Sequence, residues 1–319
     1  MKPRFRFAPT PSRPLHIGNA FAALAGWAMA SRANGTLVLR IEDIDRARCR
    51  PEYEKACLDD LEWLGIQWDE GPLIGGAFGP YRQSERLAGY DNLMTRLAEK
   101  ERAYACCCSR AEVLKAQRAP HLHRGIELPY PGTCRAPDRC VRHLKPNLDR
   151  GGLRLDVHRL EDKARVSFVD GIQGARFEDV RRTSGDFLLG RPGTPTYQLA
   201  VVADDISMKI DHVVRGRDLL GSTARQLLLF RALNACPPRF SHHGLLLDEE
   251  GDKFSKREHA MTMEGLRASG VSAERMIAAI GVSAKVFSSR IARANAEDFK
   301  EALATSSLSM DHPLEERLL

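Results

Sequence analysis

The chain has 319 residues, of which 43% are hydrophobic and 28% are charged, as in an ordinary globular protein. No segment approaches the roughly 18 consecutive apolar residues that cross a membrane, and no apolar segment follows the basic start MKPRFRFAPTP. These features argue against a membrane protein and a secreted one, and we expect a cytoplasmic chain of about one to three domains. The net charge of +6 is a mild indication of a polyanionic partner.

The first 45 residues predict a strand, a helix and a second strand. Residues 2–7 form the expected strand, and a helix of small apolar residues spans 19–33 and stops at Asn34. The nearly continuous apolar segment at 36–41 is typical of a buried parallel strand. Such a unit indicates an α/β fold of the nucleotide-binding type. Acidic residues begin at Glu42, at the carboxyl end of a strand, where ligands bind in open α/β sheets.

The later segments predict further elements of both kinds. Helices are expected at 51–65, at 84–102 and at 222–234, the last with Ser222 as its cap. Residues 106–150 are expected to be a loop-rich insertion, residues 153–180 to hold short strands, and residues 196–206 to be a buried strand or a helix. Residues 261–319 are expected to hold short helices that end in a polar, mobile tail.

His16 and Gly18 precede the first helix, whose amino end has free N–H groups and a positive dipole end suited to phosphate. A glycine lets a base approach the backbone, and the imidazole can hydrogen-bond a phosphate oxygen as charge develops. Taken alone the pattern is weak, because a loop histidine is more often structural. A second segment, Lys253 to Arg257 after Gly251, has the composition of a flexible basic loop that closes on a triphosphate. By itself it is more often a solvated turn.

Six segments, taken together and in order, resemble the catalytic domain of class I glutamyl-tRNA synthetases. They are RFAPTPSRPLHIGN, RIEDID, YRQSER, YQLAVVADD, VVRGRDLL and DKFSKR, within roughly residues 4–260. The resemblance implies a Rossmann-type α/β class I aminoacyl-tRNA synthetase catalytic domain with a zinc-bearing insertion and a small helical C-terminal part. The two phosphate-binding signatures depart from the family pattern: Asn19 replaces the final His of HIGH, and in KMSKS Phe254 replaces Met and Arg257 the final Ser.

The resemblance also assigns roles to residues. His16 and Lys256 are expected to be catalytic, and ATP is expected to contact His16, Gly18, Asn19, Lys253 and Lys256. Glutamate is expected to be bound by Arg6, Phe7, Ala8, Pro9, Thr10, Glu42, Tyr197 and Arg215. This set suits a dicarboxylate, since arginine forks bind carboxylates, Glu42 can pair with the amino group and Tyr197 adds a hydroxyl. An isolated arginine would more often form a surface salt bridge. Asp43 and Asp45 are expected to be ordinary strand-end charges.

Five of the eight cysteines fall between 106 and 140, which in a reducing compartment favours metal over disulfides. Cys106, Cys108 and Cys134 suit tetrahedral zinc but need a fourth ligand, for which Cys140, His121 and His123 are conventional. The pattern C-x-C followed by Y-x-x-x-C resembles a short subgroup of the family, the glutamyl-queuosine tRNA(Asp) synthetases, in which a tyrosine, here Tyr130, completes the site. Free thiols are the alternative.

These features divide the chain into a Rossmann-type first half at 1–105, an insertion with the zinc site and RNA contacts at 106–195, a second half at 196–260, and a helical region at 261–319. Only 62 residues follow Arg257, whereas an anticodon-binding domain needs on the order of 100. The expectation is therefore a chain without such a domain, which favours the short subgroup.

That resemblance implies formation of glutamyl-adenylate from L-glutamate and ATP, without tRNA. Glutamate then passes to the cyclopentenediol of queuosine at the wobble position of tRNA(Asp). Implied cofactors are structural Zn²⁺ and Mg²⁺ with ATP, and the chain is expected to be a monomer. Two alternatives remain, a short synthetase that charges the 3′ end of tRNA(Glu) and a non-catalytic binding protein. Basic residues of the insertion are candidate RNA contacts: Arg110, Lys115, Arg118, Arg124, Arg135 and Arg139.

Overall fold

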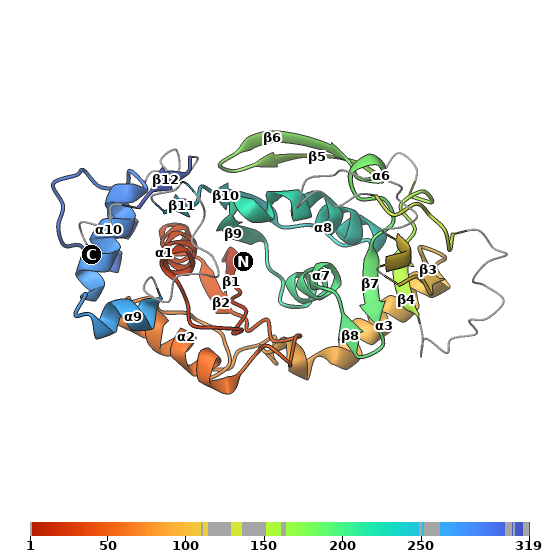
Figure 1. Ribbon diagram of the computed structural model, residues 1–319, viewed down its shortest axis with the longest axis horizontal. Coiled ribbons are helices and arrows are strands. Elements are labelled where there is room, and N and C mark those ends of the chain that lie inside the picture. Colours follow the sequence, from red (N-terminus) through yellow and green to blue (C-terminus); the bar gives the residue numbers. More distant parts are fainter. Residues whose placement is uncertain are drawn as a thin grey trace.

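A four-stranded parallel sheet lies at the centre of the computed structural model (Figure 1). The structure describes residues 2–109, 111–113, 129–135, 151–160, 164–248, 251, 262–303, 308, 310–314 and 319. The strand order is β10 (Arg239–His243), β9 (His212–Gly216), β1 (Arg4–Phe7) and β2 (Thr36–Leu39). From β1 the chain proceeds to β2 on one side and later to β9 and β10 on the other. The carboxyl ends beside such a reversal are where open α/β sheets bind ligands.

Each face of this sheet carries its own apolar core, because neighbouring side chains of a strand point to opposite faces. Leu37 and Leu39 pack in the core around helix α1 (Ile17–Arg32). Val38, between them, packs in the second core with helices α7 (Tyr197–Ser207) and α8 (Leu220–Ala232). The helix α1 ends where Asn34 adopts a left-handed backbone with φ of 49°, as the sequence predicts.

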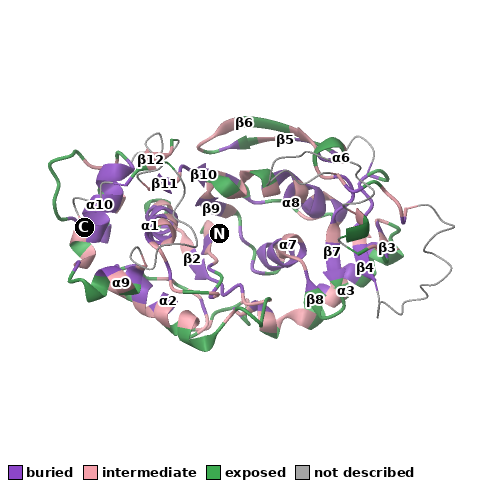
Figure 2. Ribbon diagram, in the orientation of Figure 1, coloured by how far each residue is buried: buried purple, intermediate pink, exposed green. Residues whose placement is uncertain are grey.

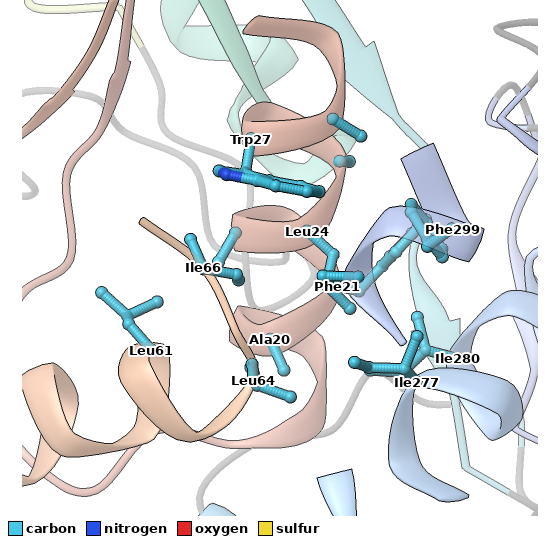
Figure 3. Close-up of a cluster of buried hydrophobic side chains, with 14 of the residues drawn as sticks. Ala20, Phe21, Leu24, Trp27, Leu61, Leu64, Ile66, Ile277, Ile280 and Phe299 are labelled. Carbon is cyan, nitrogen blue, oxygen red and sulfur yellow. The ribbon is translucent and has the colours of Figure 1, made fainter. Parts of the chain in front are cut away.

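The C-terminal helices are α9 (Met263–Ala268), α10 (Ala273–Ser283) and α11 (Ala296–Ala302). Of these, α10 and α11 pack against α1, and α9 packs against α2 (Pro51–Trp63). Figure 3 shows Phe21 and Leu24 of α1 beside Ile277, Ile280 and Phe299. On another side of α1 lie Leu61, Leu64 and Ile66, from the end of α2 and the chain that follows it. The small residues of α1 allow this close packing on several sides.

A second, antiparallel sheet lies at the opposite end of the molecule from the C-terminal helices (Figure 1). Its order is β3 (Ala103–Cys106), β4 (Gly152–Leu155), β7 (Leu188–Arg191) and β8 (Thr194–Pro195). The hairpin β5 (Arg165–Asp170) and β6 (Gly174–Asp179) shows more exposed surface than the central strands in Figure 2. The remaining elements are η1 (Gln83–Glu85), α3 (Leu87–Glu99), α6 (Val180–Thr183), η4 (Arg217–Leu219), β11 (Leu246–Leu247) and β12 (His312–Pro313).

The structure decides one alternative that the sequence left open and revises two expectations. Residues 197–207 form a helix, which decides between strand and helix. Ser222 does not cap α8, because that helix begins two residues earlier at Leu220; its hydroxyl instead accepts a hydrogen bond from Gln198. The described part of the C-terminal tail is not a free polar end, since β12 pairs in parallel with β11 and Leu314 is buried. In the described part of the chain, no helix combines the length and apolarity that a membrane span needs.

Candidate functional site

A cavity of about 390 Å³ opens at the carboxyl ends of the parallel strands. Among its lining residues are eleven that the sequence assigns to glutamate or ATP, namely Arg6, Phe7, Ala8, Pro9, Thr10, His16, Gly18, Asn19, Glu42, Tyr197 and Arg215. They come from β1, the loop after it, α1, the segment after β2, α7 and β9. The structure therefore brings segments far apart in sequence to one place. Asp43 and Asp45 lie outside the lining and bond Ser84 and Arg48 respectively.

Three of the charged side chains that line this cavity are buried. Arg6, Glu42 and Arg215 are each less than 8% exposed. Burial raises the pKa of Glu42, although the cations Arg40 and Arg6 oppose that shift. Burial likewise lowers the pKa of Arg215. Two guanidinium groups and a carboxylate with little solvent around them make strong electrostatic partners for a small ligand that carries both charges.

A buried cation that sequence reasoning missed anchors one wall of the cavity. Arg40 follows β2, is fully buried, and pairs with Asp205 at 2.7 Å and with Glu42 at 3.2 Å. Asp205 also lies 3.6 Å from Arg6. Burial alone would lower the pKa of Arg40, but its acidic neighbours raise it overall, so Arg40 stays charged. Two features of the sequence could have indicated this buried ion pair. Arg40 stands at the end of an apolar strand, and Asp204 and Asp205 end the segment YQLAVVADD.

The segment YRQSER supports the same wall from the other side. Gln83 donates to Asp204 at 2.8 Å, and Arg86 donates to the second carboxylate oxygen at 2.6 Å. Asp204 in turn lies 3.7 Å from Arg40 Nε. None of these residues lines the cavity, so this segment positions α7 and Arg40 without contacting a ligand there.

His16 is the N-cap of α1. Its Nδ1 accepts a hydrogen bond from the Gly18 amide at 3.1 Å, and the side-chain oxygen of Asn19 accepts one from the His16 amide at 3.1 Å. The helix therefore begins at Ile17, two residues before the predicted start. Asn19 closes a reciprocal capping box, which gives a structural reason for the residue that departs from the HIGH signature.

Lys253 and Lys256 lie outside the described residues. The residues before that segment, Leu245 and Leu246, line the cavity. After it, the chain returns at Thr262, which forms a backbone bridge with His16, and the Met263 amide donates to the Leu15 carbonyl at 2.8 Å. Both described flanks of the lysine-bearing segment therefore adjoin the cavity.

A second cluster lies at the far end of the antiparallel sheet. The sulfur atoms of Cys106, Cys108 and Cys134 lie within 4.8 Å of one another. The Tyr130 hydroxyl is 3.5 Å from the Cys106 sulfur and 3.4 Å from the Cys108 sulfur. All four sequence-predicted ligands are thus together. The alternative fourth ligands His121, His123 and Cys140 lie outside the described residues.

The donor set suits a soft, tetrahedral cation such as zinc. Three thiolates and a phenolate would hold it, and a positive group already borders them. Arg154 Nε donates to the Cys106 sulfur at 3.2 Å, and its guanidinium lies 3.9 Å from the centre of the Tyr130 ring. This guanidinium would offset part of the negative charge that four anionic donors leave around a divalent cation.

Arg135, one of the predicted RNA contacts, forms an ion pair within the protein. Arg135 Nη2 lies 2.6 Å from Asp186 Oδ2, so its charge is paired within the protein. The other five candidates, at 110, 115, 118, 124 and 139, lie outside the described residues.

Comparison with known proteins decides the family. Residues 2–300 match the model described as tRNA synthetases class I (E and Q), catalytic domain. The chain belongs to this family. This membership confirms the expected class I aminoacyl-tRNA synthetase fold and the expectation of a ligase of that type. It extends over both sheets and the C-terminal helices α9 and α10.

Two relatives in the family are named glutamyl-Q tRNA(Asp) synthetase. That of Symbiobacterium thermophilum is 45% identical, over 85% of this chain and 83% of the relative. That of Nitratidesulfovibrio vulgaris is 41% identical, over 96% and 93%. Glutamate–tRNA ligase 2 of Syntrophus aciditrophicus is 41% identical, but the match covers 86% of this chain and only 56% of that protein.

The fold agrees with solved structures of the family. A glutamate tRNA ligase from Elizabethkingia meningosepticum, crystallised with its amino acid, superposes with a TM-score of 0.84 at 27% identity. The superposition covers all of this chain and 68% of that one. The difference in length is similar to that with the glutamate–tRNA ligase relative.

Proposed function

We propose that this protein activates L-glutamate with ATP, without tRNA, and transfers the glutamyl group to the cyclopentenediol of queuosine in tRNA(Asp). The observation that carries the first half is the cavity itself. It holds two buried arginines and a buried glutamate beside the capped start of α1. The relatives named glutamyl-Q tRNA(Asp) synthetase, matched over most of their length, support the second half.

Glutamate binding follows from the charges of the cavity. Arg6 and Arg215 are the groups for the two carboxylates, and Glu42 pairs with the ammonium group. Tyr197, at the start of α7, adds a hydroxyl donor. Arg40, through Asp205 and Glu42, fixes this set before the substrate arrives, which reduces the reorganisation that binding requires.

Activation joins the α-carboxylate of glutamate to the α-phosphorus of ATP and releases pyrophosphate. The charge that develops on the phosphates faces the amino end of α1 and His16, whose Nδ1 is held by the Gly18 amide. Lys256 is proposed to stabilise the same charge, with Lys253 binding ATP. Mg²⁺ bound with ATP would neutralise part of the phosphate charge. A hydroxyl of the acceptor then attacks the mixed anhydride and releases AMP.

The cysteine cluster is proposed to hold one structural Zn²⁺ through Cys106, Cys108, Cys134 and Tyr130. It joins β3 to the segment at 129–135, and so would hold the insertion in place. It lies apart from the cavity and takes no part in activation.

Glutamate-dependent exchange of pyrophosphate into ATP, measured without tRNA, tests the activation step. Exchange with glutamate and not with glutamine or aspartate is expected. No exchange with any amino acid would favour a non-catalytic binding protein. Exchange that requires tRNA(Glu) would favour a short glutamyl-tRNA synthetase, as the relatives named glutamate–tRNA ligase allow.

A further inference from the structure

Arg215 is held by a chain of buried polar groups that reaches outside the cavity. Its Nε donates to His242 Nε2 at 2.9 Å, and its Nη2 donates to the Thr223 hydroxyl at 2.9 Å. Arg215 and His242 are directly paired neighbours on the parallel strands β9 and β10. Among the described residues, Arg215 Nη1 has no hydrogen-bond partner although it is buried. Two of the three guanidinium nitrogens are therefore fixed by protein, and one is left over.

The geometry also determines the tautomer of His242. A guanidinium only donates hydrogen bonds, so His242 Nε2 must be the acceptor and the proton must sit on Nδ1. That Nδ1 lies 2.5 Å from Asp170 Oδ2. Burial lowers the pKa of His242, in agreement with a neutral ring. Both ring nitrogens are thus used, one as donor to Asp170 and one as acceptor from Arg215.

Asp170 is built to stay ionised. Its Oδ1 accepts from the backbone amides of Ile172, Gln173 and His242, at 3.0, 2.9 and 3.0 Å. Burial by itself would raise the pKa of Asp170, but the hydrogen bonds from His242 and these amides hold it at about 2. Asp170 ends β5 of the hairpin β5–β6, and no residue of that hairpin lines the cavity.

We propose that Asp170 and His242 are positioning residues that orient Arg215 so that its free Nη1 meets a substrate carboxylate. The hairpin β5–β6 thereby contributes to glutamate recognition without touching glutamate. This inference rests on the proposed function, in that Arg215 binds glutamate. It also explains why a histidine, and not an apolar residue, is buried at this point of β10. A residue that only filled space would not need two directed hydrogen bonds in a fully buried position.

Two substitutions of His242 separate positioning from packing. In H242N the amide reaches about as far as Nδ1, so it keeps the bond to Asp170 and loses the acceptor for Arg215. In H242Q the side-chain oxygen reaches about as far as Nε2 and can still accept from Arg215. In pyrophosphate exchange we expect H242N to raise KM for glutamate about tenfold and H242Q less than about threefold. KM for ATP is expected to stay within about twofold in both.

Asp170→Asn tests the residue that holds His242, and it replaces H242N as the test if H242N does not fold. It keeps a similar shape and removes the charge that fixes the ring, so KM for glutamate is expected to rise about threefold or more. Gln173→Ala is the matched control. The side-chain amide of Gln173 donates to the backbone carbonyl of His242 at 2.9 Å, so it ties the same hairpin to β10 through the backbone of His242. Its KM for glutamate is expected to be unchanged.

Equal increases in H242N, H242Q and Q173A would overturn the proposal, because they would show a general loosening of the hairpin. Unchanged KM in both H242N and D170N would overturn it as well. Equilibrium dialysis with labelled glutamate distinguishes this failure from failure of the proposed function. If the unmodified protein binds glutamate but catalyses no pyrophosphate exchange, the proposed activation step is wrong. The Kd values of the same variants for glutamate then decide whether Asp170 and His242 position Arg215. If it binds no glutamate, both are overturned.

Discussion

His16 depends on the residue two positions after it. A Cβ built on Gly18 would lie 3.0 Å from two atoms of the His16 ring, which is tighter than ordinary packing. The ring is fixed by its bond to the Gly18 amide, so it cannot move away without losing that bond. Gly18 is thus required for the orientation of His16, in addition to its proposed role of leaving room for a nucleotide.

Gly18→Ala is accordingly expected to lower kcat of pyrophosphate exchange about tenfold or more, with a smaller change in KM for glutamate. Gly89→Ala, in helix α3 with nothing within 4 Å of the new methyl group, is the control. It should leave exchange unchanged, since alanine is only a better helix former there. Equal activity of the two variants would contradict the proposed role of His16.

Glu42→Gln removes the proposed anionic partner of the substrate ammonium group while keeping the shape of the side chain. Because Glu42 is buried, the loss of its charge is poorly screened, and kcat/KM for glutamate should fall about tenfold to a hundredfold. KM for ATP should change little. Steady-state exchange kinetics measure both, and a larger effect on ATP than on glutamate would place Glu42 in the wrong subsite.

Among the secondary-structure elements, β3 is joined to the segment 129–135 by the cysteine cluster. About one zinc per chain is expected by metal analysis of the purified protein, and Cys106→Ser should lose it and lower Tm. Cys236→Ser is the control, because Cys236 is exposed and does not belong to the three-sulfur group. Metal-free unmodified protein, or equal loss of metal in the two variants, would contradict the proposed site.

The pairing of β12 with β11 also joins two elements that lie far apart in the sequence. The Asp311 carboxylate accepts from the Leu245 amide at 2.7 Å and pairs with Arg217. It therefore fixes the start of β11, where Leu245 and Leu246 line the cavity. A Cβ on Gly244 would overlap the Met310 carbonyl oxygen at 1.6 Å, which shows how closely the two segments approach.

Asp311→Ala should therefore lower the free energy of unfolding by about 1–3 kcal/mol, because it leaves a backbone amide without its acceptor. Chemical denaturation measures this. Asp59→Ala removes an exposed i,i+4 ion pair with Lys55 and should have little effect. Equal stabilities of the two variants would mean that the β11–β12 pairing adds nothing to the folded state.

At the scale of the whole molecule, acid stability should depend on Asp170. Its pKa is about 2 when folded and 3.8 for an ordinary aspartate, so the folded state binds this proton less tightly than the unfolded state. The ionised Asp170 therefore adds on the order of 2 kcal/mol to the free energy of unfolding. This contribution is fully present above about pH 4 and is lost as the pH falls through about 2. Urea denaturation from pH 5 to 2 should show a steeper loss for the unmodified protein than for D170N. Parallel curves would contradict the depressed pKa.

The sequence predicted the parts of this molecule that depend on local patterns and on motif order. The first strand–helix–strand unit, the cavity residues around Arg6 and the cysteine cluster are examples. It did not predict Arg40, because the three carboxylates that keep this cation buried are distributed over two separate segments. It placed the start of α1 two residues late, because a histidine is a rare N-cap. The tail was misread because a two-residue strand has no periodicity to detect.

The most direct test of the proposed function is transfer of labelled glutamate, in the presence of ATP and this protein, to three RNAs: tRNA(Asp) with queuosine, the same tRNA with guanosine in its place, and tRNA(Glu). We expect label on the queuosine-containing tRNA(Asp) alone, with release of AMP and pyrophosphate. Label on tRNA(Glu), or equal label on the two forms of tRNA(Asp), would contradict it.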